Sequence, residues 1–210
     1  PAYVACVYDE GQSGREVLFP GYKADRKATP SDLRIQFPYV RRVVEALAVA
    51  QVSLPGYEAD DVIACLAAKA RGCGLDVVIV SIDKDLLQLV GPHVQLYDTM
   101  RGRRLGPAEV EARYGVPPEK LGDVLALMGD SVDSVPGVPG IGEKTAAQLI
   151  AQFGSLEALL SRIDEVKGAK KQQALREHAE AARLSRTLVG LRDDLPVALD
   201  LEAARPHPPD

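Results

Sequence analysis

Hydrophobic positions in the first half of the chain form short runs separated by longer amphipathic stretches. The runs predict four strands, at residues 3–8, 51–54, 76–82 and 93–97. Helices are expected between them, from about residue 32, at 59–70 and at 85–90. Pro38 should kink or restart the first helix, because proline lacks the N–H that an inner helical position needs.

This alternation of strands and helices predicts an α/β layer with a mostly parallel central sheet flanked by helices. The run at 76–82 is almost wholly β-branched, which is typical of a strand covered on both faces. The stretch at about 10–31 is polar, glycine-rich and basic, so we expect a segment that is mobile or ordered by a ligand.

The pattern changes after Pro107, where helical periodicity with glycine and proline breaks replaces the strands. We therefore divide the chain into an α/β core at 1–106, a helical region at 107–204 and a tail at 205–210. The proline-rich tail is typical of a linker or a frayed end.

Composition narrows the class of protein. With 210 residues, 46% of them hydrophobic and 26% charged, the chain is typical of a globular protein with one sizeable core. No apolar run approaches the roughly 18 residues that span a bilayer, and no signal-peptide pattern opens the chain, so no membrane partner is expected. Three cysteines without zinc-ligand spacing indicate reduced thiols and a cytoplasmic location. The first residue is Pro1 and not Met, so we expect processing or trimming from a longer chain.

Acidic residues follow the ends of the predicted strands. Asp9 ends the first strand, and Asp83 and Asp85 close the third with a spacing that puts both side chains on one side of an extended chain. The functional crevice of an open parallel sheet lies at the carboxyl ends of its strands. We therefore expect convergence of six acids, namely Asp9, Glu58, Asp60, Asp61, Asp83 and Asp85. Asp130 and Asp133 add two more from a turn between helices.

Each of these acids alone has a structural interpretation as a helix cap, a first-turn residue or a turn former. Gathered in one place, they would repel one another strongly without cations. Mg²⁺ and Mn²⁺ are the natural partners of all-oxygen sites, and two such ions can bind a scissile phosphate and activate water. The pattern predicts a divalent metal site. It also explains how a net charge of −5 is compatible with a nucleic-acid partner.

A glycine-rich string at 135–145 precedes an amphipathic helix at 146–153. Glycines let another backbone approach closely, and amides at a helix start form an anion cradle. Such a hairpin positions a duplex by its phosphates and reads no bases. A plain turn between helices is the structural alternative. The length of the string favours DNA binding, through Gly137, Gly140, Gly142, Lys144 and Thr145.

Basic residues follow Asp9 closely. Arg15, Lys23 and Arg26 are candidates to neutralise phosphoryl charge in catalysis, and Tyr22 could stack on an unpaired base. A solvated loop with incidental charge is the alternative, and the residues alone leave both open.

Five motifs in order carry a family resemblance: Y-D at 8–9, G-Y-K-A-D-R at 21–26, P-G-Y-E-A-D-D-V at 55–62, D-K-D-L at 83–86 and A-L-M-G-D-S-V-D-S-V-P-G-V-P-G-I-G-E-K-T at 126–145. They resemble the 5′-nuclease domain of bacterial DNA polymerase I and, more loosely, the flap-endonuclease family, from residue 1 to about 196. The resemblance implies a PIN/FEN-like fold, with an arch or clamp at about 10–31 and a helix–hairpin–helix at about 126–153. The hairpin would grip duplex DNA beside a monovalent cation such as K⁺.

The implied activity is Mg²⁺- or Mn²⁺-dependent hydrolysis of DNA at 5′ ends and 5′ flaps, with a polymerase domain or protein in the intact system. The eight acids match the family's metal-site acids. Lys23 and Arg26 match residues that contact the scissile phosphate, and Arg15 is placed with them.

Three departures from the family pattern stand out. Nothing precedes Pro1 to supply the family's first strand and helix, which carry another metal-site aspartate. Without that strand the sheet would expose a backbone edge. Gly14 and Ser134 stand where an aromatic residue and asparagine are usual. A truncated DNA-binding module that cuts poorly is therefore the alternative function. A small-molecule phosphohydrolase is disfavoured by the hairpin.

Overall fold

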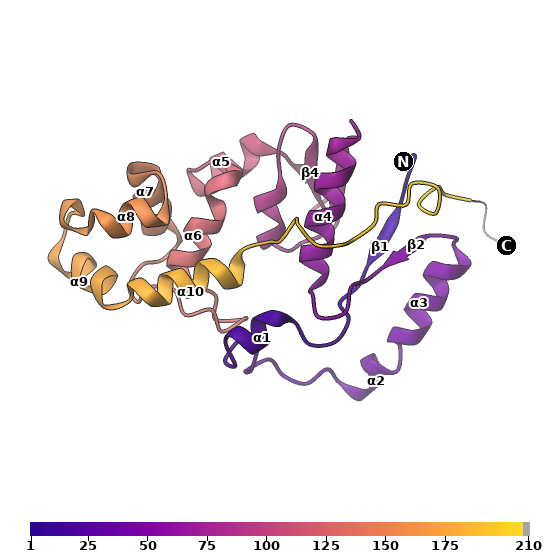
Figure 1. Ribbon diagram of the computed structural model, residues 1–210, viewed down its shortest axis with the longest axis horizontal. Coiled ribbons are helices and arrows are strands. Elements are labelled where there is room, and N and C mark those ends of the chain that lie inside the picture. Colours follow the sequence, from indigo (N-terminus) through magenta and orange to yellow (C-terminus); the bar gives the residue numbers. More distant parts are fainter. Residues whose placement is uncertain (208–210) are drawn as a thin grey trace.

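The computed structural model describes residues 1–207 and contains two small sheets in an α/β arrangement (Figure 1). In the first sheet, β1 (Ala5–Val7) runs parallel to β2 (Ala50–Val52). In the second, β3 (Val77–Val80) runs parallel to β4 (Val94–Asp98), and β5 (Arg103–Leu105) returns antiparallel to β4. The four predicted strands are confirmed, with β1, β2 and β3 shorter than predicted and β2 and β4 shifted by one residue, whereas β5 was not predicted.

The expected single central sheet is present as two separate sheets, one containing β1 and the other β3. Each of these two strands has a strand partner on one edge only within residues 1–207. The prediction that the strand at 76–82 is covered on both faces is wrong. Ile79 is buried, but Val78 and Val80 on the other face are 41% and 65% exposed. The β-branched run correctly predicts a strand, but it does not predict whether another element covers each face of that strand.

The helices are α1 (Gly14–Leu18), α2 (Ser31–Arg34), α3 (Phe37–Ala46), α4 (Ala59–Gly72), α5 (Pro107–Tyr114), α6 (Leu121–Met128), α7 (Glu143–Phe153), α8 (Leu156–Ser161), α9 (Ala169–Glu177) and α10 (Ala179–Val189). Short 3-10 helices occupy η1 (Asp85–Leu89), η2 (Pro118–Lys120) and η3 (Ile163–Glu165). Pro38 lies in the first turn of α3 and restarts the helix, as predicted. The basic segment was expected to be mobile or ordered by a ligand; it contains α1 and anchors Tyr22 in the core.

The main core lies around α6, whose sequence is apolar on nearly all sides and therefore suits a helix enclosed by others. It packs against α7 and α10. Gly129 ends it with a φ of +68°, a conformation that favours glycine. Figure 1 shows α7, α8 and α9 at one end of the molecule and β1, β2 and α3 at the other, with α4 between them. No helix in residues 1–207 is long and apolar enough to cross a membrane.

A candidate metal centre and DNA interface

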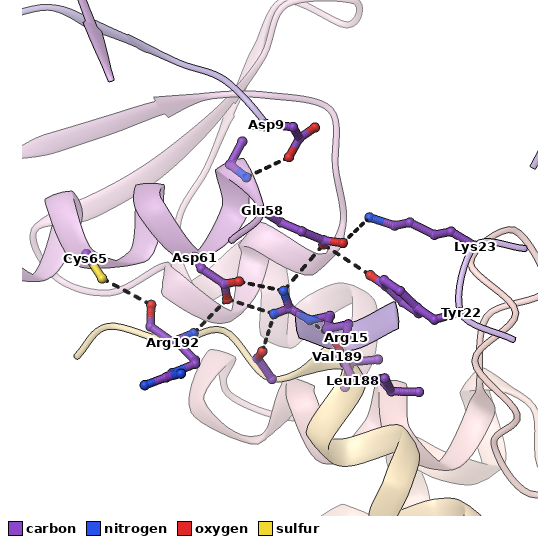
Figure 2. Close-up of polar contacts among 12 residues, drawn as sticks. Asp9, Arg15, Tyr22, Lys23, Glu58, Asp61, Cys65, Leu188, Val189 and Arg192 are labelled. Carbon is purple, nitrogen blue, oxygen red and sulfur yellow. Dashed lines mark hydrogen bonds and ion pairs between the residues drawn. The ribbon is translucent and has the colours of Figure 1, made fainter. Parts of the chain in front are cut away.

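The acidic residues meet where α4 begins. Asp9 follows β1, and its Oδ1 accepts a hydrogen bond from the backbone N–H of Ala59 at 2.7 Å, so it caps the start of α4 from outside (Figure 2). Glu58 is the residue just before the helix and is 8% exposed. An acid that follows β1 and acids at the start of α4 therefore lie close together.

The convergence of acids shifts the pKa of Asp60. Burial, followed by the negative charges of Asp83, Glu58 and Asp9, raises the pKa of Asp60 to about 7. Acids from three separate stretches of the chain therefore act on one carboxyl group. An excess of negative charge of this kind is stabilised by a bound cation.

A second group of acids surrounds Lys84, which lies between Asp83 and Asp85 in sequence. The Lys84 ammonium pairs with Asp130 and lies 3.3 Å from Oδ1 of Asp85. Burial raises the pKa of Asp85, against the attraction of Lys84. Burial opposes the shift at Asp130, but hydrogen bonds from Lys84 and the Val132 N–H lower its pKa. Sequence reasoning missed Lys84, although its position between two aspartates was a signal.

The basic segment reaches the acids, as the sequence indicated it could. Lys23 Nζ donates to Glu58 Oε1 at 2.7 Å, and Arg26 Nη2 donates to Asp133 Oδ1 at 2.6 Å. The Lys23 N–H also donates to the carbonyl of Asp133 at 2.9 Å. The segment is thereby tied to both the α4 start and the turn before α7.

Tyr22 is not exposed, as a side chain that stacks on a base would have to be. Its ring is 6% exposed and packs in the core, and its hydroxyl donates to Glu58 Oε2 at 3.2 Å. An unpaired base could reach the ring only if the segment moved. Tyr22 therefore holds Glu58 in place in this conformation, and the expected stacking role has no support in it.

Arg15 and Asp61 form an enclosed pair, which is joined to the acidic site because Arg15 Nη1 also lies 3.5 Å from Glu58 Oε2. The Arg15 guanidinium donates to both carboxylate oxygens of Asp61 and to two backbone carbonyls at the end of α10 (Figure 2). The Arg15 side chain is 11% exposed. Asp61 is 1% exposed and also accepts from the Arg192 N–H at 3.0 Å. The structure thus sets Asp61 apart from the open acids, and it keeps Arg15 away from an incoming phosphate.

The remaining acids have the chemistry of a divalent-cation site. They offer carboxylate oxygens only, and Asp60 retains a proton near neutral pH. No three histidine, cysteine or acidic side chains in residues 1–207 are close enough to share an ion. The ammonium and guanidinium groups of Lys23, Lys84 and Arg26 lie among the acids and balance part of their charge.

The predicted hairpin joins α6 to α7. Gly140, with a φ of +80°, and Gly142, the residue before α7, are exposed, and a Cβ at either would meet nothing within 4 Å. Lys144 is exposed in the first turn of α7, and Thr145 is half-buried beside it. Gly137 is different: it is buried, and its N–H donates to Ser185 Oγ at 2.9 Å. Its amide is therefore used inside the protein and is not offered to a phosphate.

Comparisons with known proteins agree with this geometry. Residues 1–115 match the family described as "5′-3′ exonuclease, N-terminal resolvase-like domain", and residues 116–210 match "5′-3′ exonuclease, C-terminal SAM fold". The chain is 46% identical over 204 residues to DNA polymerase I of Rhizobium leguminosarum, covering 97% of this chain and 20% of that protein. It thus spans about a fifth of the length of this relative.

Two solved structures have the same fold. Bacteriophage T5 5′-exonuclease with bound divalent zinc ions is 24% identical, with a TM-score of 0.79, covering 88% of this chain and 73% of that one. The T5 flap endonuclease in a complex with DNA and metal ions is 25% identical, with a TM-score of 0.77, covering 88% of this chain and 72% of that one. The resemblance and the fold class predicted from the motifs are confirmed.

Proposed function

Because the chain belongs to the 5′-3′ exonuclease family, we propose that it hydrolyses DNA phosphodiester bonds near 5′ ends, including those of 5′ flaps, with two divalent cations, Mg²⁺ or Mn²⁺. The observation that carries this proposal is the gathering of Asp9, Glu58 and Asp60 at the start of α4. Burial, followed by the negative charges of these neighbours and of Asp83, raises the pKa of Asp60, and a cation would stabilise this excess of negative charge. The T5 relative with DNA and metal ions supports both the substrate class and the use of metal.

The acids that would hold the cations are Asp9, Asp60, Asp83, Asp85, Asp130 and Asp133, which are exposed or half-buried, together with the buried Glu58. When bound, such cations polarise phosphoryl oxygens and lower the pKa of water. We assign Asp61 to positioning and not to metal binding, because its oxygens are held by Arg15 and by the Arg192 N–H.

Lys23 and Arg26 would stabilise charge on the reacting phosphate, since their side chains are 20% and 50% exposed beside the acids. They now pair with Glu58 and Asp133, so DNA and cations would compete for partners that are already at the site. Lys84 is assigned to the same role of balancing carboxylate charge until cations bind.

The exposed hairpin would hold the duplex. Gly140, Gly142 and Lys144 are exposed and Thr145 is half-buried at the start of α7, where anions are favoured. We extend the proposal to a K⁺ ion at the hairpin carbonyls. We also propose that a DNA polymerase, as a domain or as a separate protein, works with this nuclease, because its relatives include DNA polymerase I.

A second candidate function is a DNA-binding module with weak or no cutting. It is favoured by the pairing of basic side chains with the acids and by the lack of a shared three-residue metal group in residues 1–207. The two candidates differ in metal-dependent chemistry and not in DNA binding.

The deciding experiment is cleavage of a 5′-end-labelled flap DNA in Mn²⁺ or Mg²⁺, with EDTA as control. We expect metal-dependent cutting that Asp83→Asn abolishes while DNA affinity stays the same. Asp76→Asn is the matched control, since this exposed carboxylate lies just before the other end of β3. Cutting that survives Asp83→Asn would contradict the metal site, and binding without any cutting would favour the module.

A further inference from the structure

The turn between β4 and β5 brings a group of arginines to the edge of the sheet where the acids lie. β3 and β4 are parallel with Val80 opposite Tyr97, and the Ser81 N–H donates to the Tyr97 carbonyl at 3.2 Å. Asp98, the last residue of β4, therefore lies at the same carboxyl edge as Asp83. Neighbouring strands are separated by about 4.8 Å, so the turn begins roughly one strand spacing from Ser81, which precedes Asp83 by two residues.

We call this turn and β5 the arginine hairpin, residues 99–105, with Arg101, Arg103 and Arg104 as its cations. Its side chains face solvent: those of Arg101 and Arg103 are 66% and 51% exposed. Arg104 is also exposed. In a protein with a net charge of −5, three exposed arginines within four positions are a local concentration of positive charge.

The negative charge near these arginines does not balance them. Asp98 serves both Arg101, whose Nη1 donates to Oδ2 at 2.9 Å, and Arg103, whose Nε lies 3.9 Å from the same oxygen. The contact found for Arg104 is the amide oxygen of Gln95 at 3.5 Å. Glu109, the nearby acid on α5, accepts from the Gly106 N–H at 2.8 Å and so serves the helix start.

A depression of about 490 Å³ lies behind the arginine hairpin, between β5 and α5, and extends its positive charge. Arg103, Arg104 and Arg113 line it, with Leu105 and Val110 at its floor. Arg113 stacks over the ring of Tyr114 at 4.7 Å.

We propose that the arginine hairpin is a second phosphate-contact surface, which binds the DNA backbone next to the phosphate held at the acids. The planar guanidinium group pairs with phosphate through two parallel hydrogen bonds. The arginine hairpin is separate in sequence from both the α6–α7 hairpin and the basic segment. This proposal rests on the proposed function, because it takes DNA to be the partner of the acidic edge.

The variants must avoid leaving Asp98 buried without a partner, which would destabilise the fold. The first variant is Arg104→Glu, since the side-chain hydrogen bond found for Arg104 is to a neutral amide. The second combines Arg101→Gln and Arg103→Gln with Asp98→Asn, which removes the buried charge along with its partners. Arg71→Gln is the matched control, because this exposed arginine lies in the last turn of α4, at the opposite end from the acids.

Affinity for a flap DNA is measured in EDTA from 50 to 300 mM salt, so that no cutting occurs. We expect both variants to bind roughly fivefold or more weakly, with a salt slope shallower by about 0.9 for each lost phosphate contact, and the control to match the wild type. Slopes equal to that of the wild type would overturn the proposal and leave an acidic protein surface as the partner.

Cutting of the same DNA in Mn²⁺ is measured separately for the wild type. If the wild type does not cut but the variants of the arginine hairpin have shallower salt slopes, only the proposed nuclease function is contradicted. Metal-dependent cutting with unchanged slopes would contradict only the arginine hairpin.

Discussion

The Arg15 guanidinium clamps the Asp61 carboxylate through two hydrogen bonds, from Nη1 to Oδ2 at 2.5 Å and from Nη2 to Oδ1 at 2.7 Å. The same guanidinium donates to the carbonyls of Leu188 and Gly190, each at 2.7 Å. One side chain on α1 thus links the first turn of α4 to the end of α10. This contact fixes the acids of α4 relative to the helical region that carries the α6–α7 hairpin.

We therefore expect Arg15→Gln to lower the free energy of unfolding by about 3 kcal/mol, because it leaves the Asp61 charge buried without a partner. Arg15→Lys should lower it less, since it keeps the charge but loses the two-pronged geometry. Denaturant unfolding measures both, with Arg26→Gln as the control for an exposed arginine.

The double variant separates positioning from metal binding. Asp61→Asn combined with Arg15→Gln should be destabilised by less than the sum of the two single changes, because the partners act as a unit. The double variant should also keep its Mn²⁺-induced stabilisation. Asp61→Asn with unchanged stability and no response to Mn²⁺ would instead make Asp61 a metal ligand.

The raised pKa of Asp60 gives the protein a distinctive pH dependence. The folded protein keeps a proton until about pH 7, whereas the unfolded chain releases it near the ordinary value of 3.8. Stability from this group is therefore greatest at low pH and declines as the pH rises from 4 to 7. Without divalent cations, Asp60→Asn should be more stable than the wild type at pH 8 by about 2 kcal/mol, after allowance for solvent screening, and equal to it near pH 4.

A bound cation favours the ionised carboxyl group, so Mn²⁺ should raise the melting temperature of the wild type more at pH 8 than at pH 6. Thermal unfolding with and without Mn²⁺ at both pH values measures this. Asp76→Asn should keep the wild-type response. If Asp60→Asn showed the same dependence on pH and Mn²⁺, the acids would not act on Asp60 as the structure indicates.

Gly137 is required where two backbone segments touch. Its φ is +60°, and a Cβ there would lie 2.5 Å from the Gly129 nitrogen, which belongs to the end of α6. Gly137→Ala should therefore destabilise the protein by about 2–4 kcal/mol, since backbone atoms must move. Gly140→Ala is the matched control: its φ of +80° adds strain of about 1 kcal/mol, but a Cβ there meets nothing. Equal losses in urea unfolding would show that strain alone matters at Gly137.

A general rule explains why acids could be expected near one another from the sequence. Parallel strands bring their carboxyl ends to one edge, so Asp9, Asp60 and Asp83 could be expected together without knowledge of any contact. The rule says nothing about which acids stay open. Asp61 differs from Asp60 only in the direction its side chain takes from the first turn of α4, and that direction depends on packing against α10.

Contacts between a side chain and a backbone carbonyl cannot be predicted from the residue types. Arg15 meets the carbonyls of Leu188 and Gly190, which are 173 and 175 positions away, and a carbonyl is present at every residue. Tyr22 followed by a lysine is compatible with base stacking as well as with core packing, and only the fold decides. β5, at Arg103–Leu105, has three residues and no alternation of polar and apolar positions, so no periodic signal could reveal it.

Lys144 provides the sharpest test of the α6–α7 hairpin. It is exposed in the first turn of α7, where the helix dipole and the free N–H groups already favour an anion. Lys144→Ala should weaken the binding of duplex DNA of any sequence and make the salt slope shallower by about 0.9, because one phosphate contact is lost. Fluorescence anisotropy on two unrelated duplexes measures both effects. Lys69→Ala removes an equally exposed lysine from the last turn of α4 and should change neither. A loss of affinity on one duplex only would mean that Lys144 reads bases, and an unchanged slope on both would mean that the hairpin does not hold the backbone.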